Sequence, residues 1–213
     1  MPRRALLPSL SSVFLAGCSV FGIRSGYEQP RYDVIATLAT NVEVRRYGPR
    51  LAAETVVAGD DEEAARNAAF RILAAYIFGA NAGDREIAMT APVEIDASSR
   101  EIAMTAPVAV AAAQPGQYVM RFFLPARYDL ATAPAPTDPR VRLLEVPAET
   151  VAVLRFSGSA APERVAEREA DLRRTLEASP WQPVGKAVGL FYDPPWTLPW
   201  WRRNEVAVAV APR

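Results

Sequence analysis

The sequence predicts an α+β domain in which a curved antiparallel sheet is built from two strand, strand, helix, strand, strand (ββαββ) units related by a pseudo-twofold axis. Three observations lead to this prediction. The 213 residues are 50% hydrophobic and 23% charged, enough to bury the core of one domain or of two fused half-units. Alternating apolar residues predict strands, and the period changes twice to that of a helix. Glu43-Val-Arg-Arg-Tyr-Gly-Pro49 and Glu145-Val-Pro147 occupy equivalent points of the two halves, where we expect hairpins.

In the first half, apolar residues alternate in three short segments, and we expect strands at residues 34–38, 42–47 and 51–57. Four acids at residues 60–63 open a helix, because negative side chains in the first turn interact favourably with the helix dipole. Gly79 ends this helix. Further extended structure is expected in residues 85–108, and a strand at residues 117–124.

The second half repeats this order after a loop rich in proline, alanine and threonine at residues 131–139. Two strands are expected at residues 141–146 and 150–156. A charged amphipathic helix follows at residues 162–178, with proline in its first turn. Strands at residues 184–192 and 204–210 complete the unit.

Nine residues occur twice without a change, as Arg85-Glu-Ile-Ala-Met-Thr-Ala-Pro-Val93 and as Arg100-Glu-Ile-Ala-Met-Thr-Ala-Pro-Val108. Both copies favour extended backbone, and the polar residues 96–99 between them favour a turn. We therefore expect a long hairpin. The extra arm either covers a groove or is a duplicated insertion without a role.

The absence of histidine excludes Ser-His-Asp and Cys-His nucleophile pairs and histidine metal sites. Cys18 is the one cysteine, so intrachain disulfides and Cys-x-x-Cys redox chemistry are excluded as well. The carboxylates Glu54, Asp60 and Glu149 match no known catalytic pairing. Lysine plus arginine (24) balance aspartate plus glutamate (24), so we expect no nucleic-acid partner. We expect a binding protein and not an enzyme.

The N-terminus resembles a bacterial lipoprotein signal. Arg3 and Arg4 precede an apolar stretch that ends in Leu15-Ala-Gly-Cys18. We expect a signal peptide at residues 1–17, a lipid-anchored tether at 18–29 that begins at lipidated Cys18, and a domain at 30–213. The protein would then face the periplasm or the exterior from a membrane of the bacterial cell envelope. The alternative is an ordinary secretory signal, or a tail with an isolated cysteine.

Three short motifs, in order and at domain-sized separation, carry a family resemblance. The helical run 70–78 leads through Gly79-Ala-Asn-Ala-Gly-Asp84 into the first copy of the repeat, and Tyr192-Asp-Pro-Pro-Trp196 precedes Arg202-Arg-Asn-Glu205. Together they resemble the SOUL haem-binding protein family over residues 27–210. The resemblance implies a distorted antiparallel β-barrel flanked by two helices, akin to bacterial effector-binding modules, with a tetrapyrrole groove beside the first helix. The second copy of the repeat departs from the family pattern.

The candidate groove residues follow from this resemblance and from residue chemistry. Apolar side chains of the first helix are candidates for the groove wall, and arginines are candidates for pairing with haem propionates, because a guanidinium meets a carboxylate as a planar fork. The candidates are Arg66, Phe70, Arg71, Leu73, Ile77, Arg202 and Arg203. The alternatives are that the apolar residues are core, that the helix arginines are a solvated edge, and that Arg202 and Arg203 pair near Asp193 or Glu205.

Iron ligation by the protein is expected to be weak or absent. Met89 and Met104 are possible weak ligands through their thioethers, although methionine in a strand is more often core. Tyr47, Tyr76 and Tyr192 are further possibilities. We expect haem or another porphyrin as ligand, held by apolar contact and propionate pairing, and no metal bound directly by the protein.

Tryptophans and prolines form a stiff aromatic loop near the C-terminus, with Trp196, Trp200 and Trp201. This loop can stack on a porphyrin, lie at the bilayer interface, or pack on its own domain. Taken together, the sequence favours a membrane-tethered tetrapyrrole carrier or buffer. The main alternative is an envelope lipoprotein that binds another hydrophobic ligand, a peptide or a protein partner through the same groove.

Overall fold

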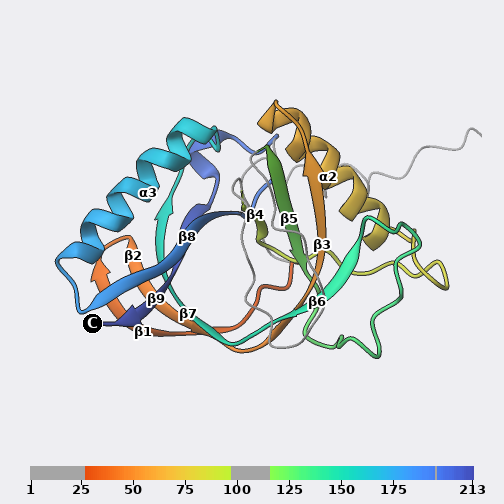
Figure 1. The fold of residues 1–213 in the computed structure, drawn as a ribbon, viewed down its shortest axis with the longest axis horizontal. Coiled ribbons are helices and arrows are strands. Elements are labelled where there is room, and N and C mark those ends of the chain that lie inside the picture. Colours follow the sequence, from red (N-terminus) through yellow and green to blue (C-terminus); the bar gives the residue numbers. More distant parts are fainter. Residues whose placement is uncertain (1–26, 97–115, 195) are drawn as a thin grey trace, which may run out of the picture.

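The structure is a computed structural model that describes residues 27–96, 116–194 and 196–213. These residues form one nine-stranded antiparallel sheet, two long helices and a short 3-10 helix (Figure 1). The elements are β1 (Tyr32–Ala39), β2 (Val42–Tyr47), β3 (Arg50–Ala58), α2 (Glu62–Ile77), β4 (Val93–Asp96), β5 (Gln117–Phe123), β6 (Arg142–Val146), β7 (Glu149–Phe156), α3 (Pro162–Glu177), β8 (Trp181–Phe191), η1 (Pro199–Trp201) and β9 (Asn204–Pro212).

The strand order β1-β2-β7-β9-β8-β4-β5-β3-β6 confirms the predicted pseudo-twofold repeat. One unit is β2-β3-α2-β4-β5 and the other is β6-β7-α3-β8-β9. Their third strands, β4 and β8, pair at the centre of the sheet, and β1 is an additional edge strand. The sheet curls like a barrel but stays open, with β1 and β6 as its edges.

The predicted hairpins at Glu43–Pro49 and Glu145–Pro147 are wrong, although the two segments are equivalent connections. β2 pairs with β7, and β3 pairs with β6, so each half exchanges its first strand with the other half. Alternation identifies a strand and its buried face, but it carries no information about the partner strand. The curl of the sheet brings these sequence-distant strands together.

The two helices cover the convex face of the sheet (Figure 1). α2 packs on β3 and β5 through Leu73, Tyr76 and Ile77, which are buried. α3 packs on β7, β8 and β9 through Leu172 and Leu176. None of the described helices is long and apolar enough to cross a membrane.

α2 begins and ends where the sequence predicts. The Asp61 side chain caps it by accepting hydrogen bonds from the backbone N–H of Glu63 (2.9 Å) and Ala64 (3.3 Å). Phe78 is the C-cap, and Gly79 follows with φ +119°, a conformation that favours glycine. These caps fix the two ends of α2, whereas its packing on the sheet decides which side chains remain at the surface.

The first copy of the nine-residue repeat joins the sheet only at its last residue. The Ile87 side chain is buried, and its N–H donates to the carbonyl of Ile77 (2.8 Å). β4 then begins at Val93 and pairs with β5 and β8. The second copy, Met104 and most of the expected turn lie outside the described residues, so the long hairpin stays a prediction.

Candidate ligand-binding site

Charged side chains line the concave face of the sheet. Arg121 on β5 donates to Glu54 (2.6 Å) and to Glu94 (2.6 Å), and Arg142 donates to the other oxygen of Glu54 (2.6 Å). Glu54, a carboxylate considered for catalysis, is fully buried in this network. The ion pairs of Arg121 and Arg142 with Glu54 and Glu94 link β3, β4, β5 and β6.

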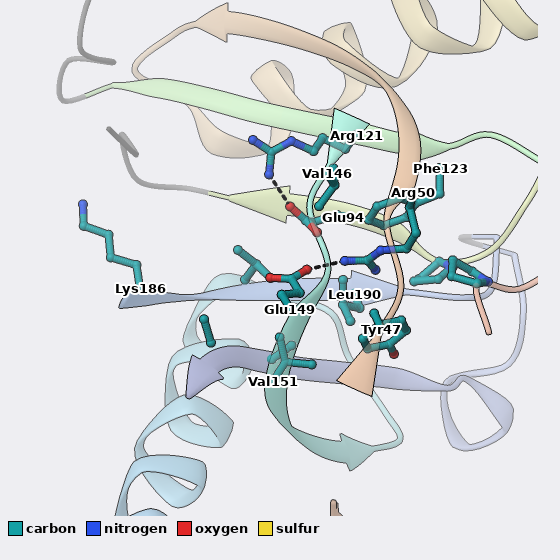
Figure 2. A pocket seen from close by; sticks show the side chains of 15 residues that line it. Tyr47, Arg50, Glu94, Arg121, Phe123, Val146, Glu149, Val151, Lys186 and Leu190 are labelled. Carbon is teal, nitrogen blue, oxygen red and sulfur yellow. Dashed lines mark hydrogen bonds and ion pairs between the residues drawn. The ribbon is translucent and has the colours of Figure 1, made fainter. Parts of the chain in front are cut away.

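A cavity of about 50 Å³ lies beside this network, lined also by Glu149, Lys186 and Leu190 (Figure 2). Arg50 pairs with Glu149, and its guanidinium lies 4.4 Å from the centre of the Tyr47 ring and 4.5 Å from that of Phe123. This volume suits water and not a tetrapyrrole.

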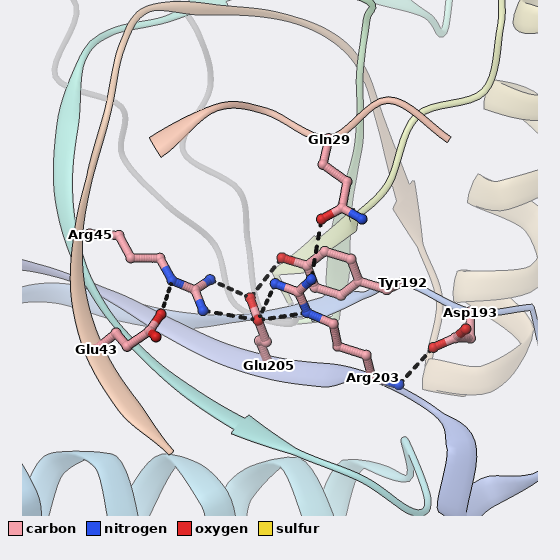
Figure 3. Close-up of polar contacts among 7 residues, drawn as sticks. All are labelled: Gln29, Glu43, Arg45, Tyr192, Asp193, Arg203 and Glu205. Carbon is pink, nitrogen blue, oxygen red and sulfur yellow. Dashed lines mark hydrogen bonds and ion pairs between the residues drawn. The ribbon is translucent and has the colours of Figure 1, made fainter. Parts of the chain in front are cut away.

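The second charged cluster surrounds Glu205 (Figure 3). Arg45 donates to both carboxylate oxygens (2.8 and 3.2 Å), Arg203 donates to Oε1 (2.7 Å), and the Tyr192 hydroxyl donates to Oε2 (2.7 Å). Burial alone raises the pKa of the Glu205 carboxyl, but these donors outweigh it and hold the pKa below its usual value. Burial, with the adjacent Glu205 charge, raises the pKa of the Tyr192 hydroxyl.

Arg203, a predicted propionate partner, is engaged in this cluster. Its guanidinium also donates to the Gln29 side chain (3.2 Å) and lies 3.9 Å from the centre of the Tyr192 ring, and its backbone N–H donates to Asp193 (2.6 Å). Arg202 donates to the carbonyl of Thr197 (2.7 Å). The sequence had left open that these arginines pair near Asp193 or Glu205, and Arg203 does so.

The convex face carries an aromatic surface beside the first half of α2. Phe122, Val93 and Phe191 are cross-strand neighbours on β5, β4 and β8. The Phe70 ring meets Phe122 edge-on (5.5 Å between centres) and is 40% exposed. The Arg66 guanidinium lies 4.9 Å from the centre of the Phe191 ring. We call Arg66, Phe70 and Phe191 the aromatic surface, and the buried Phe122 ring of the core supports Phe70.

Arg66 joins the two halves of the molecule at this surface. Its guanidinium donates to the carbonyl of Ala160, just before α3 (3.2 Å). The nearest carboxylate, that of Glu62, lies 3.7 Å from the guanidinium. Burial lowers the pKa of the guanidinium, which stays charged at neutral pH. Arg71, one and a half turns further along α2, is exposed and donates to the carbonyl of Asn67 (3.2 Å).

The other predicted site residues belong to the core. Leu73 and Ile77 are buried against the sheet, and Met89 packs against the same cluster. The Tyr76 hydroxyl donates to the carbonyl of Pro134 (2.9 Å), and burial raises its pKa to about 12. Among the described residues, no group of three or more Cys, Asp and Glu side chains is arranged to hold a metal ion.

A cavity of about 360 Å³ opens near the start of β1, within the range of ~300–1,000 Å³ usual for small-molecule sites. The N-terminal segment, the β2–β3 connection and the segment after β5 form its walls, with Arg31, Tyr32, Arg46 and Tyr128 among them. Arg50 and Phe123 line both this cavity and the 50 Å³ cavity. Sequence reasoning missed Phe122, Phe191 and the arginines of this cavity. Each is a single residue of an ordinary strand or loop, and no motif in the sequence marks it as a binding residue.

These features define a class of molecule: a two-repeat α+β module with a curled open sheet, a charged interior and an aromatic surface beside one helix. Solved structures share this fold. The C-terminal domain of EcmrR matches with a TM-score of 0.57 and 11% identity, over 85% of this chain and 99% of that one. A hydrolase from Listeria innocua matches with a TM-score of 0.52 and 10% identity, over 80% of this chain and 92% of that one.

The family is identified by a match over most of the chain. The model of the family described as SOUL heme-binding protein matches residues 27–209, and the chain belongs to this family. The resemblance carried by the three sequence motifs is therefore confirmed. No curated protein matches the chain. The family assignment supports tetrapyrrole binding, whereas the distant solved structures support the fold alone.

Proposed function

We propose that this protein is a membrane-tethered carrier or buffer for haem or another tetrapyrrole, anchored through lipidated Cys18 in the bacterial cell envelope and without enzymatic activity. The aromatic surface carries the proposal. It combines a half-exposed phenylalanine with an arginine whose nearest carboxylate lies beyond hydrogen-bonding distance. In a family that binds haem, this is the combination that a flat apolar ring with propionates requires.

The porphyrin ring would lie against Phe70, and Arg66 would pair with a propionate. Offset or edge contacts between aromatic rings contribute ~0.5–1.5 kcal/mol beyond the apolar area that they bury. Arg66 is suited to the carboxylate because its guanidinium is already positioned by the Phe191 ring and the Ala160 carbonyl. Arg71 and Arg202 remain secondary candidates for the other propionate.

Iron is expected to be ligated weakly or by solvent. The sequence has no histidine, and the described tyrosines considered as ligands have their hydroxyls in the interior. A haem bound at the aromatic surface would be held by its ring and its propionates. The protein would then bind metal-free protoporphyrin about as tightly as haem.

The alternative function is the binding of another hydrophobic ligand, a peptide or a protein partner. The 360 Å³ cavity favours it, because aromatic walls and the cationic side chains Arg31 and Arg46 also suit an acidic amphiphile. Arg46→Gln separates the two sites, since it changes this cavity and leaves the aromatic surface intact.

Titration of haem and of metal-free protoporphyrin into the Cys18→Ser chain tests the proposal. We expect similar affinities for the two ligands and a broad, shifted Soret band without the signature of two strong protein ligands. A sharp low-spin spectrum that disappears in Met89→Ala or Met104→Ala would show that methionine ligates iron. No binding of either porphyrin would favour the alternative function.

A further inference from the structure

We infer that the loop between β8 and β9, residues 192–203, is a second membrane contact, with Trp196, Trp200 and Trp201 in the interfacial layer of a lipid bilayer. The inference rests on the proposed lipid anchor at Cys18, which brings the domain to the membrane. The tryptophan loop would then determine which face of the domain the membrane meets.

Three of the four tryptophans in the chain lie in this loop and face solvent. Trp196, Trp200 and Trp201 are 64%, 67% and 53% exposed, so the loop does not bury them against its own domain. Large apolar side chains grouped in this way mark an interaction surface. The sequence had left self-packing open as an alternative, and these exposures argue against it.

The described residues of this loop, 192–194 and 196–203, are held by backbone hydrogen bonds. The backbone N–H of Thr197 donates to Pro194 (3.0 Å), and that of Trp201 donates to Leu198 (2.9 Å). The Pro199 carbonyl accepts from Gly158, just before α3 (2.8 Å). Thr197, in the middle of this segment, is fully buried. The indole rings therefore project from a backbone that is already hydrogen-bonded, and binding would not have to order it.

The chain enters the domain beside this loop. The Gln29 side chain accepts a hydrogen bond from Arg203 (3.2 Å), two residues after Trp201 (Figure 3). Residues 18–26 separate the lipid site from Tyr27, and nine residues span at most about 30 Å in any conformation. A lipid on Cys18 would therefore keep Tyr27, where the chain enters beside the tryptophan loop, within about 30 Å of the lipid.

The chemistry of the loop fits a lipid interface. Residues 196–201, Trp-Thr-Leu-Pro-Trp-Trp, contain no charged side chain, so entry into the headgroup layer requires no charge to be desolvated. Tryptophan is enriched at membrane interfaces because its ring is apolar while its indole N–H remains a donor. A protein partner would fit the exposed rings too, but it would not explain why the tether ends beside the same loop.

Brominated phospholipids test the inference, because bromine quenches tryptophan fluorescence only at short range. The full chain with Trp181→Phe leaves the loop tryptophans as the only ones. The full chain with Trp196→Phe, Trp200→Phe and Trp201→Phe leaves Trp181, which packs in the cluster under α3, as the matched control. On vesicles of phosphatidylethanolamine and phosphatidylglycerol, we expect bromine to quench the loop emission and to leave the Trp181 emission unchanged.

Equal quenching of the two chains on vesicles overturns the inference. It is also overturned if the loop substitutions lower haem affinity while bromine leaves the loop emission unchanged, because the loop would then belong to the porphyrin site. A second measurement uses the Cys18→Ser chain. Trp200→Ala should lower its partition into vesicles several-fold, and Phe78→Ala, an equally exposed control at the far end of α2, should not. A failure of the proposed lipid anchor would be detected separately. In that case the parent and the Cys18→Ser chain would bind vesicles equally well.

Discussion

At the scale of single residues, Glu205 shows how the curled sheet keeps charges in its interior. Burial of a carboxylate costs several kcal/mol, and here two arginines and a tyrosine hydroxyl offset that cost. The pKa of Glu205 is held below its ordinary value of 4.5. Its stabilising contribution is therefore complete above that pH and is lost as the pH falls through the lower pKa of the folded state.

Glu205→Gln should destabilise the fold by roughly 3–5 kcal/mol at neutral pH, because it leaves Arg45 and Arg203 buried without their shared carboxylate. Glu43, 2.8 Å from Arg45, compensates in part and favours the lower end of this range. Urea unfolding at pH 7 and pH 4 measures both effects. The stability difference between parent and variant should shrink at the lower pH, and equal stability at pH 7 would contradict this account.

Sequence reasoning identified residue types here but not their partners. The Arg-Arg-Asn-Glu motif was recognised, yet Arg202 and Arg203 looked equivalent. Arg203 is engaged by Gln29, which is distant in the sequence, and no local pattern reports such a contact. The same holds for Arg66, whose ring contact Phe191 lies in the other half of the chain.

At the scale of elements, helix and strand positions followed the sequence closely because caps and periodicity are local signals. α2 begins after Asp61 and ends at Ile77, as its acids and Gly79 predict. The sequence left open whether the apolar side chains of α2 form a groove wall or the core. The structure divides them, with Leu73 and Ile77 in the core and Phe70 at the surface. That division depends on how α2 is rotated on β5, which a helical pattern alone does not determine.

Gly189→Ala tests the support that β8 gives to the aromatic surface. A Cβ atom at this position would lie 2.8 Å from the Phe191 ring, so the ring must shift beneath Arg66. We expect a destabilisation of ~1–3 kcal/mol and a weaker porphyrin affinity. Thermal unfolding and Soret titration measure the two effects. Gly48→Ala is the control, since its Cβ would meet no atom within 4 Å, and similar behaviour of both variants would argue against the role of Phe191.

At the scale of the whole molecule, two repeats share an architecture while their interiors have diverged. One cross-strand row runs from Arg121 through Glu94 and Leu190 to Glu205. The two ends of this row are equivalent positions of the two halves, yet Arg121 is positively charged and Glu205 is negatively charged. The order of elements therefore revealed the repeat in the sequence, whereas side-chain identity concealed it.

Cys18→Ser should release the protein from membranes and leave its domain intact, because the folded domain begins after the tether. Membrane fractionation of cells measures attachment, and Soret titration of the same variant measures ligand binding. We expect an uncleaved or soluble precursor that binds porphyrin like the parent. A variant that loses porphyrin binding would return Cys18 to the candidate iron ligands.

The central claim is that a porphyrin lies on the aromatic surface with a propionate on Arg66. The most direct measurement compares the affinities of the parent, Arg66→Gln and the control Arg71→Gln for haem and for haem with esterified propionates. Arg66→Gln should weaken haem binding by ~1.5–3 kcal/mol, the range for a hydrogen bond to a charged group, and should have little effect on the esterified ligand. Unchanged haem affinity in Arg66→Gln, or an equal loss for the esterified ligand, would contradict the claim.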